Sequence, residues 1–359
     1  MKFLEILGES VNRHFSNEEA VYLTVLLIGS FVFFYLVGGL IAPVLIGLVL
    51  AFLLDGLVKR LNQSGVPALL SVCLVFLFFL GAMVALVLFL VPLVWQQLRA
   101  LVVALPSVFE QARNLLLELA ESSPGFVTVE QVDHWLSSIT TEAAVLSGTI
   151  LNSLLNEVPE LLGTLLYLVI VPFSVFFFLK DGDRLLTWFT SLLPKNRSLL
   201  NRLGKEMNGQ LINYVRGKFI EILIVGSLAF LVFAFFGLNY ALLLSVLVGL
   251  SVLIPFVGAA VVTVPVLLVA VVQYGWSMEF AGVFGAYLFI QFIDANFLVP
   301  LLFSTSVDLH PITIVLAVLL FGGLWGFWGV LFAIPLATLI KAIYLAWPSQ
   351  STNSSVEAV

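Results

Sequence analysis

Long stretches without a charged residue dominate the chain. Val21–Leu54 is uncharged over 34 residues and Ile222–Met278 over 57. At a rise of 1.5 Å per residue these runs would form helices of roughly 51 and 85 Å, whereas the hydrocarbon core of a bilayer is about 30 Å thick. Each run must therefore fold back, so the pattern predicts several membrane-spanning helices with breaks inside the runs.

Glycine and proline mark where those breaks are expected. Gly38-Gly39 and Pro43 divide the first run into two predicted spans, 21–37 and 40–54. In the second run the expected breaks are Gly237-Leu238-Asn239 and Pro255–Gly258. Both residue types favour chain reversals, because glycine adopts positive φ and proline lacks an N–H group.

Four further apolar segments predict spans over 67–95, 161–179, 280–301 and 312–340. Glycines between Gly322 and Gly329 interrupt the last segment, which leaves open whether it forms one span or a hairpin. The predicted fold class is therefore all-α, a polytopic transmembrane helix bundle with about eight hydrophobic spans and broken or re-entrant helices. We expect the lipid bilayer to be its first partner.

Composition supports this class and excludes others. Hydrophobic residues make up 61% of the chain and charged residues 10%, whereas soluble domains carry about 25% charged residues. The net charge of −6 argues against binding nucleic acid, which requires a basic patch. One cysteine, Cys73, and three widely separated histidines predict no metal cluster and no cofactor.

Loop charges predict the orientation. The segment 180–221 contains eight lysines and arginines, whereas 99–160 contains Arg99 and Arg113 against eight acidic residues. Because cytoplasmic loops are enriched in lysine and arginine, we expect 180–221 inside and 99–160 outside. Two spans before Lys59-Arg60 then place the N-terminus in the cytoplasm, while the side of the C-terminus is left open.

The chain is thus divided into seven segments. They are an N-terminal interfacial helix over 1–20, spans one to three over 21–98, an extracytoplasmic segment of short helices over 99–160, span four over 161–179, a basic cytoplasmic amphipathic segment over 180–221, a transport core over 222–348, and a disordered tail over 349–359.

The basic segment carries an apolar stripe. Its members recur every four residues, which predicts one face of a helix lying on the membrane surface or against the bundle and continuing into the next span; they are Leu199, Leu203, Met207, Leu211, Val215 and Phe219. Arg216, Lys218 and Glu221 end this segment. We expect their charged groups to reach water at the membrane interface.

Asp294 is the first candidate for a functional residue. It is the only charged residue between Glu279 and Asp308, and a carboxylate at membrane depth costs several kcal/mol unless it is paired, hydrated or protonated. Gln291 shares its helical face and Asn296 is close in sequence, so the three could bind a polar solute or a cation. The alternative is that they hydrogen-bond to neighbouring helices.

Other candidates concern proton coupling and gating. Asp308 and His310 flank the last segment, and His310 could titrate near neutral pH or simply cap a helix. Paired glycine–proline breaks indicate discontinuous helices of the kind that form transporter sites, or close helix packing. The break residues are Pro255, Gly258, Pro300, Gly322, Gly326, Gly329 and Pro335.

These motifs together resemble the autoinducer-2 exporter family of bacterial membrane proteins. The resemblance rests on Ile254–Gly258, on Gln291-x-x-Asp294-x-Asn296-x-x-x-Pro300, and on Leu309-His-Pro311 with the glycines that follow it. The ending Phe321–Ala337 with Ala346-Trp-Pro348 looks like its PerM-type permease branch. Many relatives carry glutamate where this chain has Asp294, so the acid is kept on a shorter side chain.

The resemblance implies a multi-pass permease of the bacterial inner membrane that forms a homo-oligomer, with a pentamer suggested by family members. Three functions follow as expectations. The first is export of a small polar metabolite resembling autoinducer-2 by alternating access, and the second is sodium–proton antiport at Asp294. The third is a membrane scaffold that transports nothing. The sequence contains no motif of a hydrolase or of a nucleotide-driven pump, so we expect no enzyme.

Overall fold

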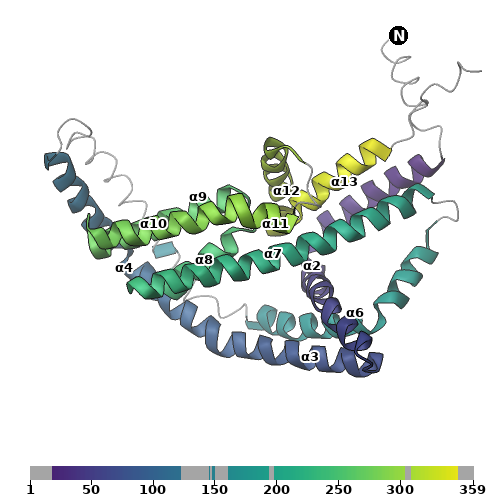
Figure 1. Cartoon of the computed structure of the whole chain (residues 1–359). Coiled ribbons are helices and arrows are strands. Elements are labelled where there is room, and N and C mark those ends of the chain that lie inside the picture. The colour runs from purple at the N-terminus through teal and green to yellow at the C-terminus, as the bar shows by residue number, and fades with distance from the viewer. Residues whose placement is uncertain are drawn as a thin grey trace, which may run out of the picture. The chain divides into compact units, whose positions relative to one another are not determined.

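The computed structural model describes residues 18–122, 145, 148–149, 161–193, 198–303 and 309–346, and the regular structure in these residues is helical throughout (Figure 1). The predicted all-α class is confirmed. The helix expected over 1–20 lies outside the described residues except for Glu18–Ala20. The tail over 349–359 and most of 123–160 also lie outside them.

The chain divides into two compact units that alternate along the sequence. Unit 1 comprises Met1–Asp55, Ser174–Val215 and Thr305–Val359. Unit 2 comprises Gly56–Phe173 and Arg216–Ser304. Each unit therefore draws its helices from distant parts of the chain.

The N-terminal apolar run forms one helix, not two. Helix α2 is continuous over Glu18–Gln63 and contains Pro43, so the predicted break at Gly38-Gly39 is wrong. Added Cβ atoms at these two glycines would meet nothing within 4 Å, so the glycines create open space instead of a turn. The prediction of a cytoplasmic N-terminus assumed two spans before Lys59-Arg60. Because the structure has one helix there, that assumption no longer supports it.

The next helices run further than the expected spans. The helical stretch α3 (Ala68–Ala85), η1 (Leu86–Leu90) and α4 (Val91–Ser122) continues well past 95, so the beginning of the segment 99–160 is one long helix and not several short ones. Helix α6 covers Leu161–Ser191, where a span over 161–179 was expected. Helix α7 covers Ser198–Phe236 without interruption, which confirms that the basic segment runs into the following span.

In unit 2, α8 (Ala241–Ser251) and α9 (Val257–Tyr274) form a helical hairpin. A Cβ atom at Gly258 would overlap the carbonyl oxygen of Ser251, seven positions earlier. In a continuous helix these residues would be about 10 Å apart, so the chain must reverse between them. Phe256 takes a positive φ of 62° at this reversal. The break predicted at Pro255–Gly258 is confirmed.

The hairpin packs against the other helices of unit 2. The preceding break is also confirmed, because α7 ends at Phe236 and Gly237 takes a φ of 71°. A buried apolar cluster joins α7, α8, α9 and α10 (Met278–Ile293), and Figure 1 shows α9 and α10 side by side. Beyond α10 the chain continues as the π-helical η3 (Asp294–Leu298) and α11 (Val299–Phe303).

Unit 1 contains a second hairpin of the same design. The helical segment α12 (Pro311–Leu331) is kinked at Gly326, whose φ and ψ are 57° and −134°, and α13 (Ala333–Ala346) follows. A Cβ atom at Gly329 would overlap the carbonyl oxygen of Phe321, so the chain doubles back around Gly326. Tyr214 of α7 donates a hydrogen bond of 3.2 Å to the Leu331 carbonyl of the returning arm. The expected interruption is confirmed as a hairpin.

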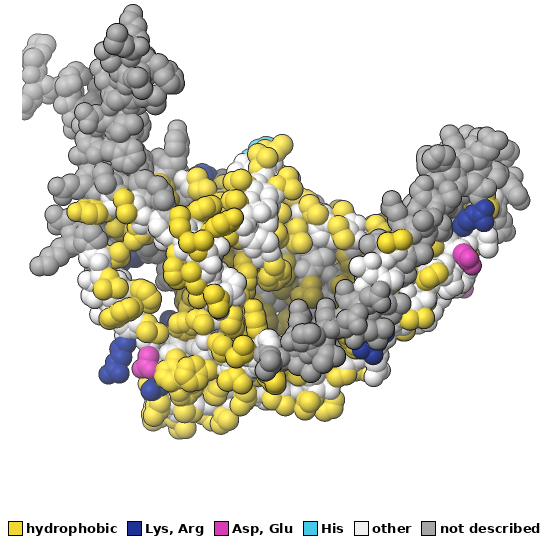
Figure 2. Space-filling view, turned by 180° about the vertical axis from the view of Figure 1, so that it is seen from behind, with side chains coloured by type: hydrophobic (Ala, Val, Ile, Leu, Met, Phe, Trp, Pro, Cys, Tyr) yellow, Lys and Arg dark blue, Asp and Glu magenta, His cyan; other side chains and the backbone are white. Residues whose placement is uncertain are grey.

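The exposed surface of the described residues is too apolar for a protein that is dissolved in water. Hydrophobic side chains cover most of the described surface in Figure 2; Leu40, Phe235 and Met278 are more than 80% exposed. Among the described residues, seven helices are long and apolar enough to cross a membrane, and two shorter apolar helices, Ala241–Ser251 and Ala333–Ile343, belong to the hairpins. The protein is therefore a multi-pass membrane protein.

Candidate functional site

A buried ion pair lies within α7 in unit 2. Lys218 is 6% exposed and Glu221 is 1% exposed. The Lys218 Nζ atom lies 2.9 Å from Glu221 Oε2. The expectation that these charges reach water at the membrane interface is therefore wrong for Lys218 and Glu221. A pair of opposite charges removed from water is costly to build, which makes this position a functional candidate.

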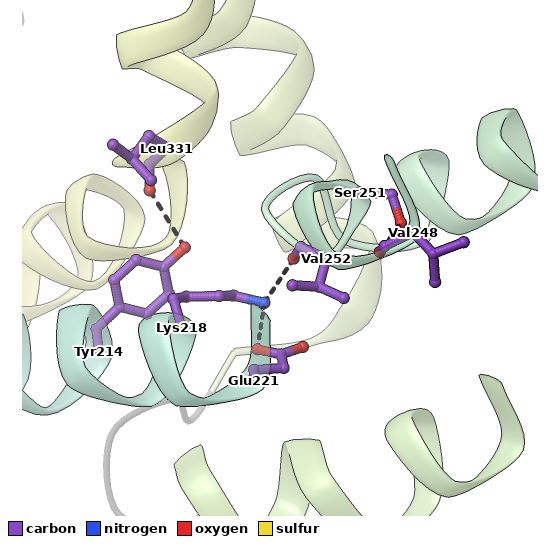
Figure 3. A network of polar contacts seen from close by, with 7 residues as sticks. All are labelled: Tyr214, Lys218, Glu221, Val248, Ser251, Val252 and Leu331. Atoms are coloured by element: carbon purple, nitrogen blue, oxygen red, sulfur yellow. Dashed lines mark hydrogen bonds and ion pairs between the residues drawn. The ribbon is translucent and has the colours of Figure 1, made fainter. Parts of the chain in front are cut away.

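Lys218 also contacts the reversal of the α8–α9 hairpin. Its Nζ donates a hydrogen bond of 2.7 Å to the carbonyl oxygen of Val252, the residue that follows α8 (Figure 3). The carbonyls of the last helical turn have no partner within their own helix. The ammonium group supplies one, so it ties the ion pair to the hairpin.

Phe303 closes the same site from the end of α11. Its ring centroid lies 5.2 Å from Lys218 Nζ, a distance at which an aromatic face attracts a cation. Gly217 permits this approach, since a Cβ atom there would lie 2.7 Å from Phe303 Cε1. Segments far apart in the sequence thus surround one ammonium group.

Asp294 brings a second acid to this environment. It is 9% exposed and begins η3; such single-turn π-helical segments occur frequently at functional sites. It interacts electrostatically with both Lys218 and Glu221. Its Oδ1 atom is buried and has no hydrogen-bond partner among the described residues. Lys218, Glu221 and Asp294, which we call the buried triad, therefore combine two acids with one base.

The two amides predicted to accompany Asp294 hydrogen-bond to other groups. Gln291 Nε2 donates to the hydroxyl of the fully buried Tyr287 at 3.0 Å, and that hydroxyl lies 2.7 Å from Thr263 Oγ1. This chain of hydrogen bonds links α10 to α9. Asn296 is exposed and donates to the Phe292 carbonyl of its own helix. The structure thus brings neither side chain into a described contact with Asp294.

The remaining predicted residues have separate positions. His310 is exposed and caps α12, its Nδ1 accepting from the Ile312 amide at 3.3 Å. Pro300 is exposed within α11. Asp308 lies outside the described residues. The other break residues belong to the hairpins, namely Pro255 and Gly258 in unit 2 and Gly322, Gly326, Gly329 and Pro335 in unit 1.

Comparison with known proteins identifies the family. The family model described as "AI-2E family transporter" matches residues 23–349. The chain belongs to this family. It is 42% identical over 345 residues to a protein of Escherichia coli strain K12 that is named as the permease PerM, covering 96% of this chain and 98% of that one. It is 28% identical over 296 residues to a Bacillus subtilis protein named as the transport protein YueF, covering 80% and 79%. The predicted family is confirmed.

The hydrogen-bonded chain of Tyr287 gives a first prediction. Replacing Tyr287 with phenylalanine leaves the Gln291 amide and the Thr263 hydroxyl without this partner, so we expect a loss of about 1 kcal/mol in stability and unchanged transport. The apparent melting temperature in detergent measures the first and vesicle transport the second. Tyr167→Phe, at an exposed position of α6, is the control. Transport lost at unchanged stability would instead make this chain part of the transport site.

Proposed function

We propose that this chain is a secondary transporter that exchanges protons at the buried triad and uses them to export a small polar metabolite by alternating access. The observation that carries the proposal is a buried lysine with two buried acids, one of which has an oxygen atom without a partner. Titratable groups buried in membrane segments mark proton and ion pathways in transporters.

The charge balance of the triad suits proton exchange. With both acids ionised and the lysine charged, the triad carries a net charge of −1. One bound proton makes it neutral, and a neutral group costs far less in a low-dielectric environment than a charged one. The buried Oδ1 of Asp294 can take a proton without any new space being opened. The protonated transporter can therefore change conformation more easily than the charged one.

Lys218 connects this charge to the reversal after α8, which we propose as the gate. When a proton neutralises an acid of the triad, the attraction that positions the Lys218 ammonium group weakens. The ammonium group can then move away and break its 2.7 Å hydrogen bond to the Val252 carbonyl. The reversal that follows α8 then loses a tether. The strained φ of Phe256 favours its movement, because such backbone strain persists only when the surroundings enforce it.

Membership of this family supports a role in transport and a location in a bacterial membrane. The family is described as one of transporters, and the relatives in Escherichia coli and Bacillus subtilis are named for permeation and transport. A small polar metabolite resembling autoinducer-2 is the cargo that the resemblance to the exporter family implies. We therefore propose a bacterial inner-membrane exporter that assembles as a homo-oligomer, with a pentamer as the first possibility. The basic segment 180–221 is proposed to face the cytoplasm, because cytoplasmic loops are enriched in lysine and arginine.

Sodium–proton antiport is the second candidate, and the surroundings of Lys218 favour it. Its ammonium group sits between a carboxylate oxygen at 2.9 Å and a backbone carbonyl oxygen at 2.7 Å. Carboxylate and carbonyl oxygens are the ligands of hard cations, and carbonyls of interrupted helices bind sodium in transporters. A displaced lysine would leave these oxygens to a sodium ion.

Asp294→Asn tests both candidates. In proteoliposomes with a pH gradient, we expect the wild-type protein to release protons in response to an added solute or to sodium. We expect the variant to show only the leak of empty vesicles, because asparagine cannot bind or release the proton. A pH-sensitive dye trapped in the vesicles reports the flux. Asp183→Asn, an exposed acid on α6, is the matched control.

The stimulus separates the candidates. Release driven by a sugar-like solute without sodium supports metabolite export, and release driven by sodium alone supports antiport. Proton flux that survives in Asp294→Asn at the level of the Asp183→Asn control would contradict the proposed role of Asp294.

A further inference from the structure

Unit 1 contains a cavity that the buried triad does not use. It has a volume of about 490 Å³, within the range of pockets that enclose small ligands. Helices α2, α7, α12 and α13 all contribute to its lining. Its walls include Tyr35, Gly38, Met207, Trp325, Trp328 and Phe332.

The lining disfavours a charged or strongly polar occupant. None of the described lining residues carries a charge or an amide side chain, and their polar side-chain groups are the Tyr35 hydroxyl and the ring N–H groups of Trp325 and Trp328. A polar solute buried there would leave most of its hydrogen bonds unmade at a cost. The aromatic rings instead offer large apolar faces. At Gly38 and Gly39 an added Cβ atom would meet nothing within 4 Å, so the side of α2 leaves the space open. The chemistry of the walls fits a hydrocarbon chain.

Basic residues stand close in sequence to lining residues on two helices. Arg202 and Lys205 are exposed on the first turns of α7, shortly before the lining residue Met207, and outnumber the one exposed acid beside them, Glu206. Lys341 follows the lining residue Leu339 on α13 by two positions. Figure 1 shows the start of α7 and the end of α13 pointing to the same side. An apolar cavity with cations at its end is complementary to an anionic lipid.

We propose that this cavity holds an acyl chain of an anionic phospholipid whose headgroup is bound by Arg202 and Lys205. The bilayer supports this occupant by mass action, since it presents acyl chains at a concentration that no dilute solute reaches. The lipid would lie against Trp325 and Trp328, on either side of the kink at Gly326. Its presence would therefore stabilise the folded hairpin of unit 1.

Lipid retention tests the proposal without any transport assay. The wild-type protein is placed in bilayer nanodiscs containing equal amounts of phosphatidylglycerol and phosphatidylcholine, extracted in a mild detergent, and examined by native mass spectrometry. We expect retained lipid with a preference for phosphatidylglycerol. Gly38→Leu should fill the cavity and lose the retained lipid. Gly29→Leu, on the same helix and equally open but outside the lining, should keep it.

The charges are tested separately. In the double variant Arg202→Gln with Lys205→Gln, lipid should still be retained, but the preference for phosphatidylglycerol should fall by about fivefold for each charge removed. Lys180→Gln with Arg184→Gln, two exposed basic residues of α6, should keep the preference. Equal retention in Gly38→Leu and Gly29→Leu would overturn the cavity as the site. Equal binding of the two lipids by the wild-type protein would overturn the role of the basic residues.

Discussion

Replacing Lys218 with methionine is expected to destabilise the folded protein by about 3–5 kcal/mol, which is the usual cost of leaving one member of a buried ion pair alone. Glu221 is only 1% exposed, so its carboxylate could not recover the lost interaction from water. The Val252 carbonyl would lose its donor as well. A fall of several degrees in the apparent melting temperature in detergent would measure this.

A second variant separates the missing charge from lost packing. Lys218→Met combined with Glu221→Gln removes both charges, and we expect it to recover most of the stability, because buried pairs can often be replaced by neutral residues at little cost. Lys180→Met, at a partly exposed position beside Asp181, should change stability by less than about 1 kcal/mol. If the double variant were as unstable as Lys218→Met, unpaired charge would not be the cause.

Alanine at Gly329 is expected to disrupt the unit 1 hairpin. Its Cβ atom would overlap the backbone carbonyl of Phe321, and a backbone cannot move aside as a flexible side chain can. We expect a loss of about 3 kcal/mol, at the upper end for an overpacked interior, and little folded protein in membranes. Gly258→Ala should behave alike, because its Cβ atom would overlap the Ser251 carbonyl.

A nearby glycine provides the opposite expectation. At Gly323 of the same helix an added Cβ atom meets nothing within 4 Å, so Gly323→Ala should be neutral or stabilising by up to about 1 kcal/mol, since alanine favours helix more than glycine does. Folded yield by fluorescence-detected size-exclusion chromatography compares the variants. Equal yields for Gly329→Ala and Gly323→Ala would contradict the close approach of the two hairpin arms.

The burial of Lys218 and Glu221 was not predicted, and the reason is the period of the apolar stripe on α7. The predicted stripe on α7 runs in steps of four from Leu199 to Phe219. An α-helix has 3.6 residues per turn, so a stripe with period four drifts around the helix. Phe219 is 43% exposed, whereas Tyr214, Lys218, Glu221 and Val225 are buried. The spacing of these four residues, four, three and four, follows the helical period. A strict helical period would have placed the two charges inside.

The prediction of two spans in the first apolar run was wrong for a different reason. Gly38-Gly39 and the run of 34 uncharged residues suggested a turn, because a single helix seemed too long for the bilayer. The same glycine signal proved right at Gly237, Gly258 and Gly326. What differs is the tertiary surroundings. The glycines that allow a chain reversal take a positive φ or contact a carbonyl, while those of α2 leave space beside the helix.

Sequence alone was enough to predict a helical membrane protein, the chain reversal at Pro255–Gly258, an interruption between Gly322 and Gly329, and the family that the chain resembles. These properties follow from local composition, from uncharged runs longer than a bilayer, and from glycines that the backbone requires. Asp294 was also selected as a candidate this way, because an isolated charge in an apolar run is visible without coordinates. The burial of Lys218 and Glu221 and their electrostatic interaction with Asp294 become visible only in the folded structure, as do the hydrogen bonds of Gln291 and Asn296 to Tyr287 and Phe292. The contacts of Lys218 on α7 with Phe303 of α11 and with the Val252 carbonyl after α8 depend on packing between segments separated by many residues, which no local pattern records.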